Sequence, residues 1–160
     1  MADCVVPGAT VTTSPSGFMN MELFAEWLHF FSGSMPASIP RPLVLILDGC
    51  GSHYSDKVVD AADALDILLV SLPPNGTHLL QPLDVAVFAT LKSKIHNIIS
   101  ELVDEDDNGY FNLSKDDAIK VASLAWGGAK VGRNLERGFK ACRLFPLSLV
   151  KMKARLDTFT

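Results

Sequence analysis

Two short stretches in the middle of the chain, residues 43–47 and 67–72, are apolar except for Ser71. Neither stretch alternates apolar with polar positions, and such a run is typical of a parallel strand covered on both faces. Residues 56–64, between them, are expected to form a helix. The order strand, helix, strand predicts a parallel βαβ unit with a right-handed crossover.

Helical periodicity predicts four further helices, over residues 20–31, 83–103, 114–126 and 132–140. Asn20 and Ser114 stand at the positions of N-caps, and Asp117 completes a capping box with Ser114. Gly33 and the Pro-rich residues 35–42 are expected to end the first of these helices, and the glycine pair at 127–128 the third. Residues 1–17, rich in Pro, Gly, Ser and Thr, are interpreted as an irregular tail, and residues 148–160 as a C-terminal tail.

The length of 160 residues fits one domain, and a chain with 48% hydrophobic and 20% charged residues is globular rather than disordered or collagen-like. No apolar run approaches the roughly 18 residues of a membrane helix, so we expect no membrane partner. Residues 1–7 lack the basic and apolar regions of a secretory signal, which favours an intracellular location.

The three cysteines, Cys4, Cys50 and Cys142, include no Cys-x-x-Cys pair. Their odd number and spacing argue against a disulfide framework and a zinc knuckle, so we expect free thiols. The net charge of -4 and the pI near 5.5 are unfavourable for a protein that binds nucleic acid on its own.

Two carboxylates follow the predicted strands. Asp48 comes directly after the first strand, and Asp84 opens the helix after the second. Ligands of open parallel sheets gather at the carboxyl ends of the strands, so we expect both carboxylates to converge there if that helix packs back across the sheet. Paired carboxylates suit Mg²⁺ or Mn²⁺, which prefer oxygen ligands.

The segments around these two residues, LILDGCGSH at 45–53 and LPPNGTHLLQPLDVAVF at 72–88, resemble the DDE superfamily endonuclease domain of pogo, Tigger and jerky-type transposases. Residues 18–24 and 134–146 extend the similarity. The resemblance implies an α/β fold of the RNase H-like (ribonuclease H-like) type, truncated at its N-terminus and followed by a helical C-terminal extension. It implies a partial DDE domain over residues 18–147.

In this family, three acidic residues hold two metal ions for DNA strand cleavage and transfer. The resemblance makes Asp48 the second acid and Asp84 the third. Asp3 is the one acid before the first predicted helix, in a stretch too short for the three strands that carry the first acid. We therefore expect an incomplete site for Mg²⁺ or Mn²⁺, and a chain inactive on its own.

The same resemblance implies DNA as a partner and a nuclear location. An apolar strand with a bare edge also predicts self-association, or pairing with a chain or domain that supplies the missing N-terminal strands.

Further polar residues are candidates for contact with nucleic acid. His53 and His78 flank the expected crevice, although structurally bonded histidines are the commoner outcome. A denser basic patch near the C-terminal end is the best candidate for phosphate contact, and it comprises Arg133, Arg137, Lys140 and Arg143.

Two alternatives stay open. One is a non-catalytic module, domesticated from a transposase, that binds nucleic acid or protein. The other is calcium binding by residues 104–115, which open like an EF-hand loop. The twelfth position of that loop is Lys115, which cannot supply the bidentate carboxylate of a calcium site, so we favour a solvated acidic loop.

Overall fold

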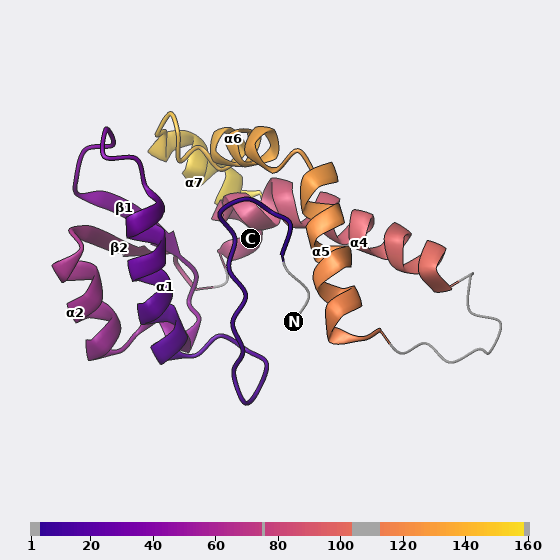
Figure 1. Cartoon of the computed structure of the whole chain (residues 1–160). Coiled ribbons are helices and arrows are strands. Elements are labelled where there is room, and N and C mark those ends of the chain that lie inside the picture. Colours follow the sequence, from indigo (N-terminus) through magenta and orange to yellow (C-terminus); the bar gives the residue numbers. More distant parts are fainter. Residues whose placement is uncertain (1–3, 75, 104–112, 159–160) are drawn as a thin grey trace. The chain divides into compact units, whose positions relative to one another are not determined.

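The computed structural model describes residues 4–74, 76–103 and 113–158. The chain divides into two compact units, one formed by Thr12–Thr77 and the other by Met1–Val11 together with His78–Thr160 (Figure 1). No helix in the described ranges is both long enough and apolar enough to cross a membrane.

The predicted βαβ unit forms the centre of the Thr12–Thr77 unit. Strands β1 (Leu43–Leu47) and β2 (Ile67–Ser71) pair in parallel, in a register that runs from Leu43 opposite Ile67 to Leu47 opposite Ser71. Helix α2 (Asp56–Ala64) connects them, and α1 (Met21–Ser34) precedes them. The prediction of two parallel strands joined by a helix is confirmed, and this unit is of the α/β class.

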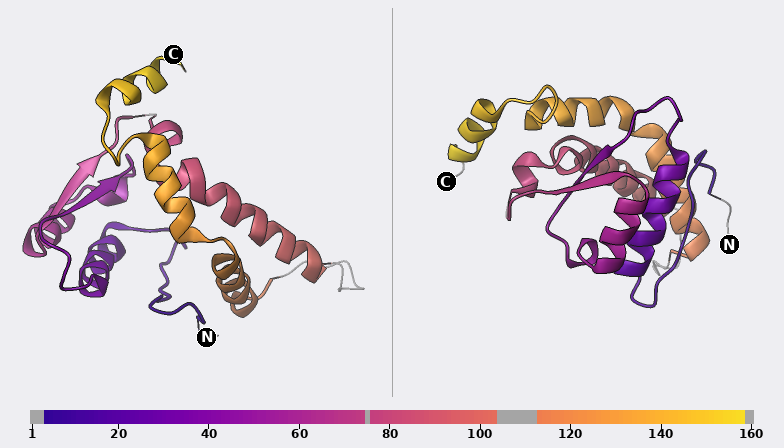
Figure 2. Two further views of the ribbon diagram at one scale, coloured as in Figure 1. Left: turned by 90° about the horizontal axis from the view of Figure 1, so that it is seen from above. Right: turned by 90° about the vertical axis from the view of Figure 1, so that its left-hand side faces the viewer.

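Both helices begin at a side-chain N-cap, which the sequence predicted for α1. The Asn20 side chain accepts a hydrogen bond from the backbone N–H of Leu23 at 2.9 Å, and Ser55 caps α2 in the same way. The helices then cover one face of the strand pair with a shared core that includes Phe24, Leu28 and Val58. Figure 2 shows them on the same side of the strands. Helix α1 runs to Ser34, one residue past Gly33, and ends directly before the Pro-rich residues 35–42, as predicted.

The expectation that both strands are covered on both faces is wrong. The side chains that point away from the helices are exposed: Val44 is 62% exposed, Leu68 53% and Val70 45%. Within the part of the chain that the structure describes, β1 and β2 pair only with each other. The apolar run identified the strands correctly, but it does not say whether a second layer covers them.

The other unit is helical. Its elements are α3 (Thr77–Leu80), the π-helical turn η2 (Leu83–Val87), α4 (Phe88–Val103), α5 (Lys115–Gly128), α6 (Val131–Cys142) and α7 (Leu149–Asp157). The long helix predicted from residue 83 is confirmed, with its first turn π-helical. Ser114 caps α5 by accepting a hydrogen bond from the Asp117 N–H at 3.1 Å, as the capping box predicted.

Two boundaries in this unit differ from the prediction. Gly127 and Gly128 lie inside α5 instead of ending it, because the helix continues until Ala129. Residues 149–157 of the expected C-terminal tail form α7, and its Arg155 donates a hydrogen bond to the carbonyl of Ala141 at 3.1 Å. That bond ties α7 to α6.

Helix α6 packs directly against η2. A Cβ atom placed on Gly138 would lie 2.5 Å from the carbonyl oxygen of Pro82, well inside van der Waals contact. The absence of a side chain at residue 138 therefore allows the two backbones to approach this closely. As a result, the turn that carries Asp84 is fixed against the helix that carries Arg133 and Arg137.

Candidate functional site

Asp48 stands directly after β1, at the carboxyl end of the strand, where the sequence placed it. Its carboxylate atom Oδ1 accepts a hydrogen bond from the backbone N–H of Cys50 at 3.0 Å. The same oxygen lies 3.2 Å from Nδ1 of His53, which belongs to the short helix η1 (Gly51–His53). The loop that follows the strand therefore folds back around its own carboxylate.

The imidazole of His53 is held from its other side by Phe24 of α1. The two ring centroids lie 4.3 Å apart with the rings tilted by 39°, and the His53 side chain is only 16% exposed. Nδ1 lies within ion-pair distance of the Asp48 carboxylate, and no hydrogen bond to this buried nitrogen is found among the residues described. The packing against Phe24 therefore fixes the imidazole beside that carboxylate.

Tyr54 ties this loop to the second strand. Its hydroxyl donates to the backbone carbonyl of Asp48 at 3.1 Å and lies 2.8 Å from Oγ of Ser71, the last residue of β2. The carboxyl ends of the two strands are thus joined through one phenol. The sequence analysis did not identify Tyr54, because nothing in the residue order shows that its side chain reaches β2.

Asp48, Cys50 and His53 form a group of potential metal ligands. Taking one donor atom from each residue, all three atoms lie within 4.8 Å of one another. The sequence analysis considered cysteines only as pairs and therefore missed Cys50. The spacing Asp-x-Cys-x-x-His over residues 48–53 was the signal that could have found it.

Asp84 lies in the first turn of η2 and is exposed. It belongs to the helical unit, whereas Asp48 belongs to the α/β unit. The convergence of these two carboxylates therefore stays a prediction. Short π-helical turns are frequent at functional sites, which is consistent with a special role for the segment that carries Asp84.

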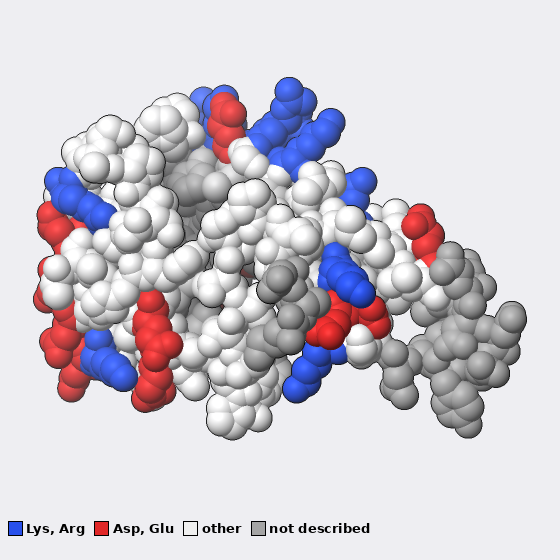
Figure 3. Space-filling view, viewed as in Figure 1, with Lys and Arg blue, Asp and Glu red and all other residues white. Residues whose placement is uncertain are grey.

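The predicted basic patch lies on α6 and directly after it. Arg133, Arg137 and Lys140 are exposed and share one helix face, and Arg143 follows the helix. Lys140 pairs with Glu136 at 2.7 Å, and this hydrogen bond, with the Lys140 charge, holds the pKa of Glu136 below its usual value. Figure 3 shows Lys and Arg side chains gathered over the α6 region.

The charge of the chain is strongly segregated along its length. Residues 130–155 contain eight of the fourteen Lys and Arg residues but only one of the eighteen Asp and Glu residues. The net charge of -4 is a sum over the whole chain and does not reveal this basic segment. The inference that the net charge is unfavourable for nucleic-acid binding therefore does not apply to α6 and α7. His78, the other histidine candidate, is exposed in α3.

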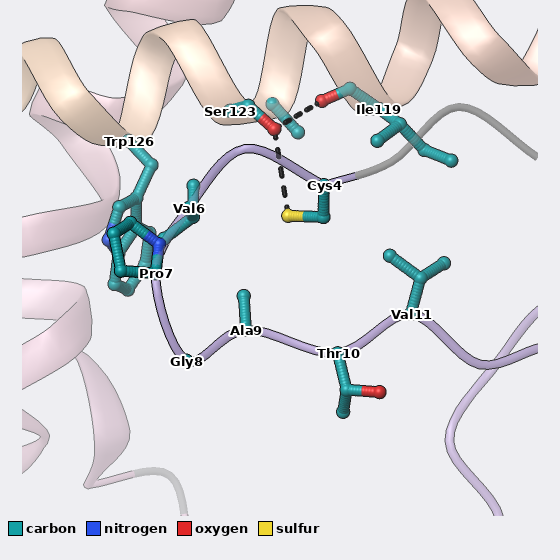
Figure 4. A pocket seen from close by; sticks show the side chains of 11 residues that line it. Cys4, Val6, Pro7, Gly8, Ala9, Thr10, Val11, Ile119, Ser123 and Trp126 are labelled. Atoms are coloured by element: carbon teal, nitrogen blue, oxygen red, sulfur yellow. Dashed lines mark hydrogen bonds between the residues drawn. The ribbon is translucent and has the colours of Figure 1, made fainter.

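A cavity of about 420 Å³ lies in the helical unit, between residues 4–11 and helix α5 (Figure 4). Ile119 and Trp126 contribute apolar surface from α5, and the sulfur of Cys4 lies 3.7 Å from Oγ of Ser123. Among the described residues that line the cavity, none carries a charged side chain. It therefore has no group suited to binding phosphate, and we do not assign the site to it.

Two sequence expectations concern other parts of the chain. The EF-hand-like segment spans residues 104–115, of which 104–112 lie outside the described residues, and Lys115 is the first residue of α5. Cys4, Cys50 and Cys142 are free thiols, as predicted.

Comparison with known proteins gives one family match, to the DDE superfamily endonuclease, over residues 7–139. A Cochliobolus lunatus protein named MFS-type transporter clz9 is 28% identical over 148 residues, which are 92% of this chain and 16% of that protein. Proteins named Pogo transposable element with KRAB domain, from Homo sapiens and Mus musculus, are 29% and 30% identical over 80 residues. These residues are 49% of this chain and 13% of each relative. The chain thus spans at most 16% of these relatives, and no solved structure matches it.

Proposed function

The chain belongs to the DDE superfamily endonuclease family, and from this premise we propose that it is a transposase-derived, nucleic-acid-binding endonuclease domain. The observation that carries the proposal is the position of Asp48 at the carboxyl end of β1 within a parallel βαβ unit, inside the matched residues. Open α/β sheets bind their ligands at this end of the strands. The domain proposed, over residues 18–147, is a portion of an RNase H-like fold.

In this proposal, Asp48 and Asp84 are the acidic residues of strand cleavage and transfer, with Mg²⁺ or Mn²⁺ as the cofactor. Such ions lower the pKa of an attacking water and stabilise the leaving oxygen when they are bound. They take oxygen ligands, but the donors nearest to Asp48 are a thiol and an imidazole. The described residues around Asp48 therefore do not fit a magnesium ion by themselves, and cleavage requires further oxygen ligands.

DNA is the proposed partner, and the nucleus is the proposed location. Helix α6 offers the contact surface, because its exposed guanidinium groups can neutralise phosphates and release counterions. A second partner, which supplies strands beside β1 or β2, is supported by the edge that each of these strands leaves unpaired within the described residues. Self-association through the same strands is the alternative.

A second candidate function is a non-catalytic binding module. The mixed sulfur, nitrogen and oxygen donors beside Asp48 favour it, because they are not the donors of the family's magnesium chemistry. In that case α6 binds nucleic acid in the same way, and Asp48 and Asp84 have no role in cleavage.

One experiment tests whether the chain binds DNA and whether it holds a complete cleavage site. The purified chain is titrated into fluorescently labelled duplex DNA at low salt and is then incubated with plasmid DNA and Mn²⁺. We expect binding without cleavage. Absence of binding contradicts the proposal, and cleavage that Asp48→Asn or Asp84→Asn abolishes shows that the chain holds a complete site. Asp63→Asn, on the exposed surface of α2, is the matched control.

A further inference from the structure

We propose that Asp48, Cys50 and His53 bind a zinc ion. This site differs in chemistry from the two-metal carboxylate site, and zinc binding here does not depend on the proposed function. The three donors are a carboxylate oxygen, a sulfur and an imidazole nitrogen, within 4.8 Å of one another. This is the ligand set that zinc takes in proteins, and magnesium does not take thiolate or imidazole in preference to oxygen.

The distance between two of the donors already matches a shared ion. Nδ1 of His53 lies 3.2 Å from Oδ1 of Asp48. Two ligands that each bind zinc at about 2.0–2.1 Å in tetrahedral geometry lie about 3.3 Å apart. The two atoms lie within ion-pair distance, and Nδ1 is buried without a hydrogen-bond partner among the described residues. A zinc ion between them would take the place of that contact and give Nδ1 a ligand bond, while Oδ1 also accepts from the backbone N–H of Cys50.

The loop supports these ligands from several sides. The ring of Phe24 fixes the imidazole plane, and the Tyr54 hydroxyl anchors the backbone of Asp48. The backbone N–H of Cys50 holds the carboxylate. Such contacts orient metal ligands in known sites and raise the affinity for the metal.

Cys50 completes the group. Its side chain is exposed, and its sulfur lies 3.2 Å from Oγ of Ser52 and within 4.8 Å of the other two donors. On binding, the thiol loses its proton to solvent and the thiolate becomes the ligand. Three protein ligands leave the fourth zinc position open to water or to a ligand of another molecule. Since zinc would occupy Asp48, its binding and the use of Asp48 in a magnesium site exclude each other.

The test measures metal binding by the whole chain without any nucleic acid. The reduced, metal-free protein is titrated with Co²⁺, whose thiolate complex absorbs in the near ultraviolet, and then with Zn²⁺ in competition. We expect one equivalent of Co²⁺ to give the thiolate band and Zn²⁺ to remove it, while excess Mg²⁺ does not. Cys50→Ser should abolish the band and weaken Zn²⁺ binding at least about tenfold, and His53→Gln should weaken it similarly.

Cys4→Ser is the matched control and should leave the band unchanged, because Cys4 belongs to the other unit. Circular dichroism checks that Cys50→Ser still folds, as expected for an exposed residue. A band that persists in Cys50→Ser, or a wild-type protein that gives no band, overturns the proposal. DNA binding is measured separately, so failure of the zinc site and failure of the proposed function give different results.

Discussion

The hydroxyl groups of Tyr54 and Ser71 lie 2.8 Å apart, and through them the loop after β1 is attached to the end of β2. Tyr54→Phe should lower the free energy of unfolding by about 1 kcal/mol, because the Asp48 carbonyl and the Ser71 hydroxyl both lose the phenol as a partner. Ser71→Ala should have a similar effect. Urea denaturation of the two single variants and the double variant measures this. If the two hydroxyls interact, the double variant should lose less free energy of unfolding than the two single variants lose together. Additive effects would contradict the link.

The close approach of α6 to η2 makes a side chain at residue 138 unfavourable. Gly138→Ala should destabilise the helical unit by about 1–3 kcal/mol, since the new Cβ would meet the carbonyl of Pro82. Gly132→Ala, on the same helix with nothing within 4 Å, is the matched control. There the substitution should stabilise the helix by about 0.5–1 kcal/mol. Thermal unfolding of the two variants measures the contrast, and equal melting temperatures would argue against the packing described.

The guanidinium groups on α6 should determine how DNA affinity depends on salt. Replacing Arg133 and Arg137 together by Ala removes two phosphate contacts. The slope of log affinity against log salt should therefore become shallower by about 1.8 for duplex DNA. Fluorescence anisotropy at several salt concentrations measures this slope. The double variant Lys57→Ala, Lys92→Ala removes the same charge from outside residues 130–155 and should change the slope little. Equal slopes in the two double variants would exclude α6 as the contact surface.

The capping box of α5 links stability to pH. The Ser114 hydrogen bond, more than the charge of Lys120, holds the pKa of Asp117 below its usual value of 3.8. A carboxylate with a lowered pKa stabilises the folded state above its unfolded pKa, and this contribution disappears as the pH falls through the folded pKa. Ser114→Ala should return the pKa of Asp117 toward 3.8, which an NMR titration would show.

The same substitution should cost about 1 kcal/mol of stability at neutral pH through loss of the N-cap. Ser148→Ala is the matched control, because Ser148 precedes α7 without making a side-chain cap hydrogen bond. If Ser148→Ala and Ser114→Ala destabilise the protein equally, the capping explanation is incorrect.

The sequence predicted most of the local structure because its signals are local. Asn20 and Ser114 mark helix starts by hydrogen bonds within one turn, and both caps are confirmed. The apolar runs identified β1 and β2 and their parallel pairing. The helix ends were less predictable, because a glycine such as Gly33 or Gly128 can continue a helix that packing or neighbouring residues stabilise. The exposure of Val44 was not predictable, since it depends on which other elements cover the sheet.

The candidate site was predictable only in part. The position of Asp48 follows from the end of an apolar strand, and the structure confirms it. The contacts of Asp48 with Tyr54 and His53 depend on how the loop after β1 folds back on the end of the strand. The order of residues in the loop does not determine that path. Whether Asp84 joins Asp48 depends on the placement of two units, and that stays a prediction.

The segregation of charge into residues 130–155 has a practical consequence for handling the protein. At neutral pH the whole chain is an anion, with a pI near 5.5. A surface that presents clustered guanidinium and ammonium groups nevertheless interacts with a polyanion through its local field, not through the net charge. The protein should therefore be retained on heparin or on a cation exchanger well above its isoelectric point, and a purification planned from the pI alone would choose the wrong column.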